Sequence, residues 1–207
     1  GEIALCILSA INVGQSTSDL KDLPELCDLA VRSLDEVIDY QEYPVEAARL
    51  STVNRRSLGI GYIGLAHFLA KNKLKYDDKE AHKLVHRLSE HFQYNLLKTT
   101  VDLAKEKGSC GYVSQTKYHG GLLPIDHYKT DVDEIVKPVY ECDWESLREE
   151  VVKYGVRNST LSAQMPSESS SVVSNETNGI EPPRDYLSIK KSKKGPLKQI
   201  VPGYPHL

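Results

Sequence analysis

The spacing of hydrophobic and polar positions changes several times along the chain. Some segments have the apolar runs or alternation that are typical of strands. Residues 1–13 form an almost continuous apolar run, which predicts a buried strand. Residues 156–165 alternate and are rich in β-branched side chains, which predicts a second buried strand. Residues 186–189 and 197–201 read as the two arms of a β-hairpin around a turn at 192–195.

Other segments repeat their apolar residues every three or four positions and predict amphipathic helices. These segments are residues 19–40 and 77–107, with Gly108 as the stop signal of the second. A short helix is expected at 45–50, and another begins at Asp143. Strands and helices therefore mix along the chain, and the predicted fold class is α/β.

The residues after the second predicted strand carry the strongest chemical signal. Pro166 ends the strand, and Ser167 is a natural N-cap that places Glu168, Ser169 and Ser170 in a first helical turn. The amides of such a turn have no intrahelical acceptor and favour an anion by about 0.3–1 kcal/mol. The turn therefore fits a phosphate-bearing ligand, although the same residues also fit a serine-rich surface loop or an ordinary capped helix.

The sequence that follows this turn is unusually constrained for a passive linker. Asn178-Gly179 is a turn dipeptide, and Pro182-Pro183 holds the chain extended. The whole segment MPSESSSVVSNETNGIEPPR resembles a signature of the large, catalytic subunit of class I ribonucleoside-diphosphate reductases. The opening residues GEIALC, with LSAIN and Gly14 after them, and the segment RRSLGIGYIGLAHFLAK resemble the same family.

This resemblance implies roles for individual residues. Cys6 matches one cysteine of the dithiol that reduces the substrate, and its partner would precede Gly1. A lone cysteine in an apolar run would otherwise be read as a small core residue. The residues that match the diphosphate-binding turn of the family are Ser167, Glu168, Ser169 and Ser170. Met165 and Pro166 match residues that line the nucleotide pocket.

The resemblance also implies a fold, a reaction and partners. The family fold is a ten-stranded α/β barrel, and residues 1–207 would be a single partial domain of it, with no second domain. The implied reaction replaces the ribose 2′-hydroxyl of a nucleoside diphosphate by hydrogen through a thiyl radical, the route to deoxyribonucleotides for DNA replication. Both ends of the chain look cut, and the radical-forming cysteine would lie before Gly1, so we expect no turnover without the remaining segments of the large subunit.

The expected cofactor belongs to a partner. A diiron-tyrosyl or similar radical centre would reside in the small subunit of the reductase, and we expect no cofactor and no metal on this chain. The non-catalytic alternative is a phosphate-binding or interaction module, the remnant of a disrupted reductase gene.

Two further motifs lack the residues that their usual ligands require. Residues 59–64 (GIGYIG) satisfy the glycine fingerprint of dinucleotide-binding folds, but a polar, basic segment precedes them, and Asp77 and Asp78 come too early for the acidic position. The glycines are expected in a helix. His82 and His86 are four positions apart, yet two ligands do not close a metal site, so we expect a solvated helix face.

Composition narrows the class of protein further. A net charge of −3 over 207 residues disfavours binding to a nucleic-acid backbone. No apolar run is long enough for a membrane span, and no signal peptide is visible. Four cysteines without close pairing fit a reducing compartment, and Cys27 on its predicted helix fits packing, so the expected location is the cytoplasm.

Overall fold

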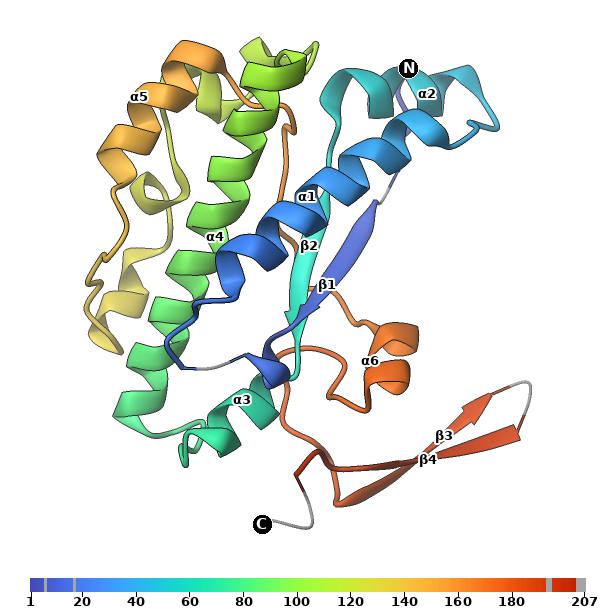
Figure 1. Cartoon of the computed structure of the whole chain (residues 1–207), viewed down its shortest axis with the longest axis vertical. Coiled ribbons are helices and arrows are strands. Elements are labelled where there is room, and N and C mark those ends of the chain that lie inside the picture. The colour runs from blue at the N-terminus through green and yellow to red at the C-terminus, as the bar shows by residue number, and fades with distance from the viewer. Residues whose placement is uncertain (6, 17, 193–194, 204–207) are drawn as a thin grey trace.

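The computed structural model describes residues 1–5, 7–16, 18–192 and 195–203. Figure 1 shows helices gathered on one side of a short pair of strands, with a separate hairpin at the opposite end. The helices are α1 (Leu23–Tyr40), α2 (Glu46–Arg55), α3 (Leu65–Lys71), α4 (Lys79–Lys107), α5 (Trp144–Tyr154) and α6 (Glu168–Ser174), and the strands are β1 (Leu8–Asn12), β2 (Gly59–Ile63), β3 (Leu187–Ser192) and β4 (Gly195–Ile200).

Strand β2 lies between two parallel neighbours. It pairs with β1 from Leu8 opposite Gly59 to Asn12 opposite Ile63. On its other edge, the Ile60 amide donates to the Leu161 carbonyl at 2.8 Å, and the Ala163 amide donates back to the Ile60 carbonyl at 3.0 Å. Strand β2 is thus hydrogen-bonded along both edges, and all five of its residues are buried.

The two predicted buried strands, at residues 1–13 and 156–165, are shorter than expected. Residues 1–5 and Ile7 lie outside β1, which begins at Leu8. Within the segment predicted as residues 156–165, only Ser162 forms a bridge, to Ile60. The apolar pattern therefore located these segments correctly but overestimated how far the ladder of hydrogen bonds extends.

The helix predicted for the glycines of residues 59–64 is wrong, because Gly59 and Gly61 lie within strand β2 itself. A Cβ on Gly61 would collide with the carbonyl oxygen of Ala163. Glycine is therefore needed here so that the neighbouring segment can approach β2. These glycines are not in a turn that follows a strand, which is where the dinucleotide fingerprint requires them.

The hydrophobic core lies between the strands and the two longest helices. Helix α1 packs on both α4 and β1, and α4 also packs on α5. Burial of each such side chain contributes roughly 1.5–3 kcal/mol. The largest fully buried side chains come from α1, β2, α3, α4 and two loop positions: Leu23, Ile38, Ile60, Ile63, Phe68, Leu69, Leu88, Leu96, Leu97, Leu103, Leu123 and Leu161.

Helix ends follow local capping chemistry. The Asp143 carboxylate accepts from the Ser146 amide at 3.0 Å and starts α5, as predicted. Helix α4 ends where Gly108 adopts a positive φ of 86°. Helix α1 begins at Leu23 rather than at residue 19, with Pro24 in its first turn. The short helix predicted at residues 45–50 is longer, reaching Arg55 in α2.

The predicted hairpin is present. Strands β3 and β4 pair antiparallel, with Ser192 opposite Gly195. In Figure 1 the hairpin extends away from α1 and α4. The part of the chain that the structure describes is thus mixed α/β, as predicted, but its named strands form two separate two-stranded sheets rather than a closed barrel. No helix among the described residues is both long and apolar enough to cross a membrane.

Candidate functional site

The predicted phosphate turn begins a short helix directly after the segment that pairs with β2. Ser167 is the N-cap of α6, as predicted, but its hydroxyl makes no capping hydrogen bond. The Ser167 amide donates to the Asn178 carbonyl at 2.8 Å. The Asn178 side chain in turn donates to Glu168 Oε1 at 3.1 Å. The loop after α6 is therefore hydrogen-bonded, through Asn178, to the start of the helix.

The first turn of α6 presents polar groups to solvent. Ser169 and Ser170 are both exposed. The amide of Ser171 is the first one bonded within the helix, to the Ser167 carbonyl at 2.9 Å. Among the described residues, the amides and hydroxyls of Ser169 and Ser170 have no partner, so they are available to an anion.

A cavity of about 500 Å³ lies beside this turn, but its charge does not suit a diphosphate. Pro166 and Glu168 line the cavity, whereas Ser169 and Ser170 do not. Four acidic residues and a single arginine are among its lining residues, so an anion inside would be repelled. These charged residues are Glu168, Glu176, Glu181, Asp185 and Arg184.

The predicted pocket residue Met165 lies over one face of the strands. Its sulfur is 2.9 Å from the position that a Cβ on Gly61 would occupy, and Leu8 Cδ2 is 2.6 Å from the equivalent position on Gly59. Leu8 and Met165 therefore share a face, and Leu8 is 48% exposed there. Cys6 lies outside the described residues, so its role stays a prediction.

A second group of polar side chains, which sequence reasoning missed, lies at the carboxyl ends of β1 and β2. We call Asn12, Gln15, His67 and Glu176 the Glu176 cluster. Glu176 Oε1 accepts from Gln15 Nε2 at 3.1 Å and contacts His67 Nδ1 at 2.7 Å. Its side chain is fully buried. No spacing in the sequence indicates this contact, since His67 and Glu176 are 109 positions apart.

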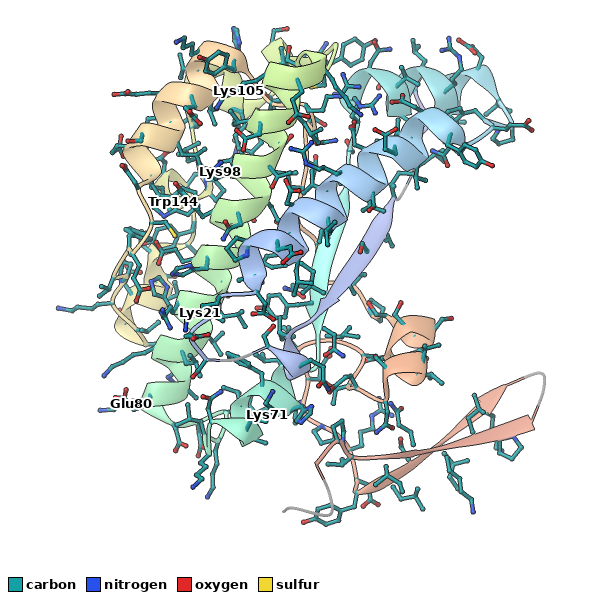
Figure 2. The ribbon with its side chains drawn as sticks, in the orientation of Figure 1. Lys21, Lys71, Glu80, Lys98, Lys105 and Trp144 are labelled. Atoms are coloured by element: carbon teal, nitrogen blue, oxygen red, sulfur yellow. The ribbon has the colours of Figure 1, made fainter. Side chains whose placement is uncertain are left out.

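Two oxygens of the Glu176 cluster lack a hydrogen-bond donor among the described residues. They are Glu176 Oε2 and Asn12 Oδ1, and both are buried. Each is 3.0 Å from the position that a Cβ on Gly64 would occupy, so both face the same glycine. Lys71, labelled in Figure 2, does not supply the donor, because its Nζ donates to the carbonyls of Gly14 and Ser16 at 3.1 and 3.2 Å.

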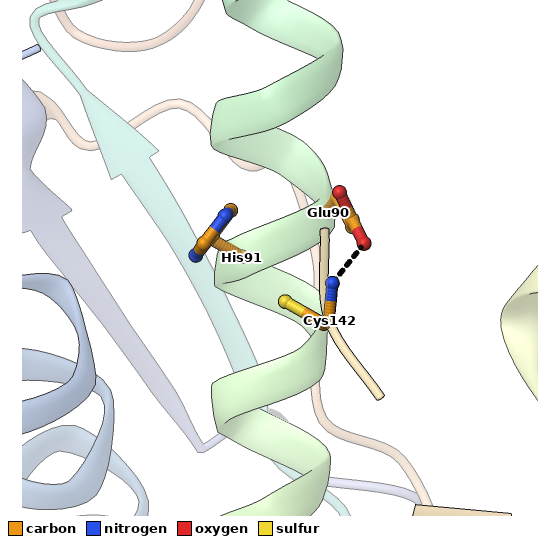
Figure 3. Close-up of side chains that lie close together, drawn as sticks. All are labelled: Glu90, His91 and Cys142. Carbon is orange, nitrogen blue, oxygen red and sulfur yellow. Dashed lines mark hydrogen bonds between the residues drawn. The ribbon is translucent and has the colours of Figure 1, made fainter. Parts of the chain in front are cut away.

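One group of possible metal ligands exists among the described residues, and Figure 3 shows it. The ligand atoms of Glu90, His91 and Cys142 all lie within 4.8 Å of one another. Glu90 Oε1 already accepts from the amide of Cys142 at 3.0 Å and from the indole of Trp144 at 3.2 Å. Burial, and then the nearby Glu90 carboxylate, raise the pKa of the Cys142 thiol to about 12. These contacts indicate a buried anchor for the chain entering α5 rather than a metal centre.

The histidine pair that the sequence singled out does not converge. His82 Nε2 lies 3.0 Å from the Tyr76 carbonyl, and His86 Nε2 lies 3.3 Å from the Val139 carbonyl. Both rings thus contact backbone on different segments. Cys27 is fully buried, as its predicted packing role requires, and burial raises the pKa of its thiol to about 12.

Comparison with known proteins identifies the relatives of the chain. The family model described as "Ribonucleotide reductase, barrel domain" matches residues 1–206. The ribonucleoside-diphosphate reductase alpha subunits of Buchnera aphidicola (from Schizaphis graminum) and Haemophilus influenzae are each 56% identical over all 207 residues. Subunit alpha of the Escherichia coli ribonucleoside-diphosphate reductase 1 is 54% identical over 170 residues, 82% of this chain and 22% of that protein. The chain spans 27% of the length of the first two relatives.

Proposed function

The chain belongs to the ribonucleotide reductase barrel-domain family, and from this premise we propose that it forms part of the catalytic subunit of a ribonucleoside-diphosphate reductase. The reaction is the replacement of the ribose 2′-hydroxyl of a nucleoside diphosphate by hydrogen, through a thiyl radical. The single observation that carries the proposal is the pair of exposed serines in the first turn of α6, Ser169 and Ser170, in a chain of this family.

The start of α6 suits the diphosphate of the substrate. Ser169 and Ser170 offer two amides and two hydroxyls that have no other partner among the described residues. Glu168 lies in the same turn, and its carboxylate is engaged by Asn178. Ser167 and Glu168 would therefore shape the turn, while Ser169 and Ser170 bind the phosphates.

The nucleotide would extend from this turn across the face that Met165 shares with Leu8. Met165 and Pro166 lead directly into α6, so they would contact the ribose or base. We infer that Cys6, two positions before the first residue of β1, supplies one thiol of the reducing dithiol. Its partner thiol, and the thiol that becomes the radical, would come from the remaining segments of the large subunit.

Two protein partners follow from the proposal. The remaining segments of the large subunit would complete the barrel around the present strands. A small subunit would supply the radical, from its own diiron-tyrosyl or similar centre. The expected product is a deoxyribonucleoside diphosphate.

The test is reduction of a nucleoside diphosphate such as CDP. The purified chain alone should give no turnover, and turnover should appear when the remaining segments and the small subunit are added. Cys6→Ser should then abolish steady-state turnover, whereas the matched variant Cys142→Ser should not. Turnover by the isolated chain, or full activity of Cys6→Ser, would contradict the proposal.

The phosphate turn is tested in the same assay. Replacing both hydroxyls, in Ser169→Ala with Ser170→Ala, should raise KM by about tenfold, since two hydrogen bonds to an anion are lost. The value of kcat should change less, because these contacts form in the ground state as well. A non-catalytic phosphate-binding module would instead bind CDP at this turn without any turnover after the other parts are added.

A further inference from the structure

Helix α6 has few apolar contacts to hold it in place. Ser171 is its single buried residue, and Val173 is 89% exposed. In Figure 1, α6 lies away from α1 and α4. Its position must therefore be set by polar contacts of the segment that follows it.

Glu176 ties the end of α6 into one unit through its backbone. The Glu176 amide donates to the Ser171 carbonyl at 2.9 Å. Gln199 on β4 donates from its Nε2 to the Glu176 carbonyl at 2.8 Å and to the Ser171 carbonyl at 3.3 Å. Residue 176 and the last turn of α6 consequently move together.

The Glu176 side chain joins this unit to the strand ends. Its Oε1 meets Gln15, just after β1, and His67, on α3. The carboxylate also fits against two glycines. A Cβ on Gly14 would lie 2.6 Å from Oε1, and a Cβ on Gly64 would lie 3.0 Å from Oε2. Gly14 and Gly64 thus leave space for the carboxylate that a side chain at either position would fill.

We propose that Glu176 is a positioning residue, which fixes the Ser167–Ser170 turn relative to the ends of β1 and β2 through Gln15 and His67. The inference rests on the proposed role of that turn in holding the substrate diphosphate. Glu176 does not itself touch the phosphates in this arrangement. It acts by holding the helix whose first turn presents the amides.

A purely electrostatic role for Glu176 makes the opposite prediction. Glu176 is one of the residues that line the cavity beside the turn, so its negative charge would repel an anion there, and removing that charge would tighten anion binding. A positioning role requires that removing the side chain weakens binding, because the turn becomes mobile. The sign of the change separates the two roles.

The experiment uses NMR on the whole 207-residue chain. Amide hydrogen exchange is measured without ligand at Ser167 and Ser171, whose amides are hydrogen-bonded to the carbonyls of Asn178 and Ser167, and inorganic pyrophosphate is then titrated while the signals of Ser169 and Ser170 are observed. In Glu176→Ala, exchange at the Ser167 and Ser171 amides should accelerate by about tenfold or more while α1 and α4 keep their protection. The dissociation constant for pyrophosphate should rise by about tenfold.

Two matched variants sharpen the result. Glu176→Gln keeps an acceptor for Gln15 and His67 and nearly the same side-chain volume, so binding should stay within about twofold of wild type. Glu181→Gln removes a carboxylate from the same cavity without touching the Glu176 cluster, so exchange at α6 should not change. Tighter pyrophosphate binding by Glu176→Ala, or equal behaviour of the alanine and glutamine variants, would overturn the proposal.

Gln15→Ala covers the case in which Glu176→Ala fails to fold. Gln15 is an exposed residue that donates one of the two contacts to Oε1, so its removal leaves the core intact. Its exchange rates should lie between those of wild type and Glu176→Ala, and wild-type exchange would contradict the proposal. If wild-type chain shows no pyrophosphate response at Ser169 and Ser170, the proposed function of the turn fails, while the exchange rates still decide whether Glu176 positions it.

Discussion

Two of the buried carboxylates in the described part of the chain have different surroundings. Asp35 on α1 and Glu176 after α6 both have side chains with no exposed surface. Asp35 meets Arg56, Arg157 and Asn158, which we call the Asp35 network. The Glu176 cluster instead leaves Glu176 Oε2 and Asn12 Oδ1 without a donor among the described residues.

Every oxygen of Asp35 has a partner. Its Oδ1 accepts from Arg56 Nε at 2.7 Å and from Asn158 Nδ2 at 2.9 Å, and its Oδ2 accepts from Arg157 Nε at 3.3 Å. Asn158 also accepts from Thr100 Oγ1 at 2.8 Å. The network thus joins α1, the end of α2, α4 and the segment beside β2, and it closes around Arg56, whose φ is 47°.

This difference indicates that the Asp35 network serves stability, whereas the Glu176 cluster serves function. A buried polar network with all groups satisfied fixes one arrangement of the elements that it joins. An incompletely satisfied cluster gives up some stability, and such groups are common near functional sites. The Asp35 network lies among the helices, whereas the Glu176 cluster lies at the carboxyl ends of the parallel strands, beside the proposed phosphate turn.

The largest expected effect comes from breaking the Asp35 network. Asp35→Ala should lower the free energy of unfolding by about 3–5 kcal/mol, because Arg56 and Asn158 lose the fully buried carboxylate that they share. Urea unfolding followed by circular dichroism measures the change. The control is Asp28→Ala, which removes a half-exposed pair with Arg32 and should cost about 0.5 kcal/mol or less. Equal losses in the two variants would show that the Asp35 network is not special.

A second test adds a methyl group to the Glu176 cluster. Gly64 has a φ of 78°, and its Cβ would meet Asn12 Oδ1, Glu176 Oε2 and the Gly14 amide nitrogen, each at 3.0 Å. Gly64→Ala should therefore cost about 2–4 kcal/mol in unfolding free energy, from backbone strain and overpacking together.

The matched control for this change is Gly121→Ala. Gly121 has a similar φ of 76°, but its Cβ would meet a methyl of Val152 at 3.1 Å, and that side chain is largely exposed and can move. The expected cost is about 1 kcal/mol from strain alone. If both variants lose the same stability, the carboxylate does not occupy the space beside Gly64.

A smaller effect is expected from the pH dependence of the ion pair between Arg56 of the Asp35 network and Asp39. Hydrogen bonds from Arg56 lower the pKa of Asp39 below its usual 3.8. The unfolded chain then binds the proton more readily than the folded one, so this stabilisation is present above about pH 4 and is lost as the pH falls through the folded-state pKa. Because Asp39 is half exposed, the contribution should stay below about 1 kcal/mol. Asp39→Asn should flatten this acid limb of stability against pH, and an unchanged limb would contradict the assignment.

The smallest effect is expected at Asn12. Asn12→Ala removes an oxygen that has no donor among the described residues, so the cost should be about 0.5 kcal/mol or less. Asn158→Ala removes the same group from the Asp35 network and should cost about 2–4 kcal/mol. Comparable costs for the two asparagines would mean that Asn12 has a partner in solution.

Local signals in the sequence predicted local structure well. Pro166 and Ser167 located the start of α6, Asp143 located α5, and Gly108 located the end of α4, because caps and breakers act within a few residues. The helix predicted for the glycines of residues 59–64 is wrong. Gly59 and Gly61 alternate with Ile60 and Tyr62, and this two-residue period is that of a strand.

Long-range polar contacts were beyond the reach of the sequence pattern. Neither the Asp35 network nor the Glu176 cluster has a characteristic spacing, because each is assembled by tertiary packing of distant segments. The candidate phosphate turn was predicted from its local pattern and from the family resemblance. The residues that hold the turn in place became visible only in the fold.

The central claim is that the start of α6 and the Cys6 thiol serve the same nucleotide. A crystal structure of the assembled large subunit with a bound nucleoside diphosphate tests it most directly. We predict phosphate oxygens within hydrogen-bonding distance of the Ser169 and Ser170 amides, with the ribose beside Cys6 Sγ. A diphosphate bound away from α6, or a Cys6 sulfur separated from that turn by more than the length of a nucleotide, would contradict the claim.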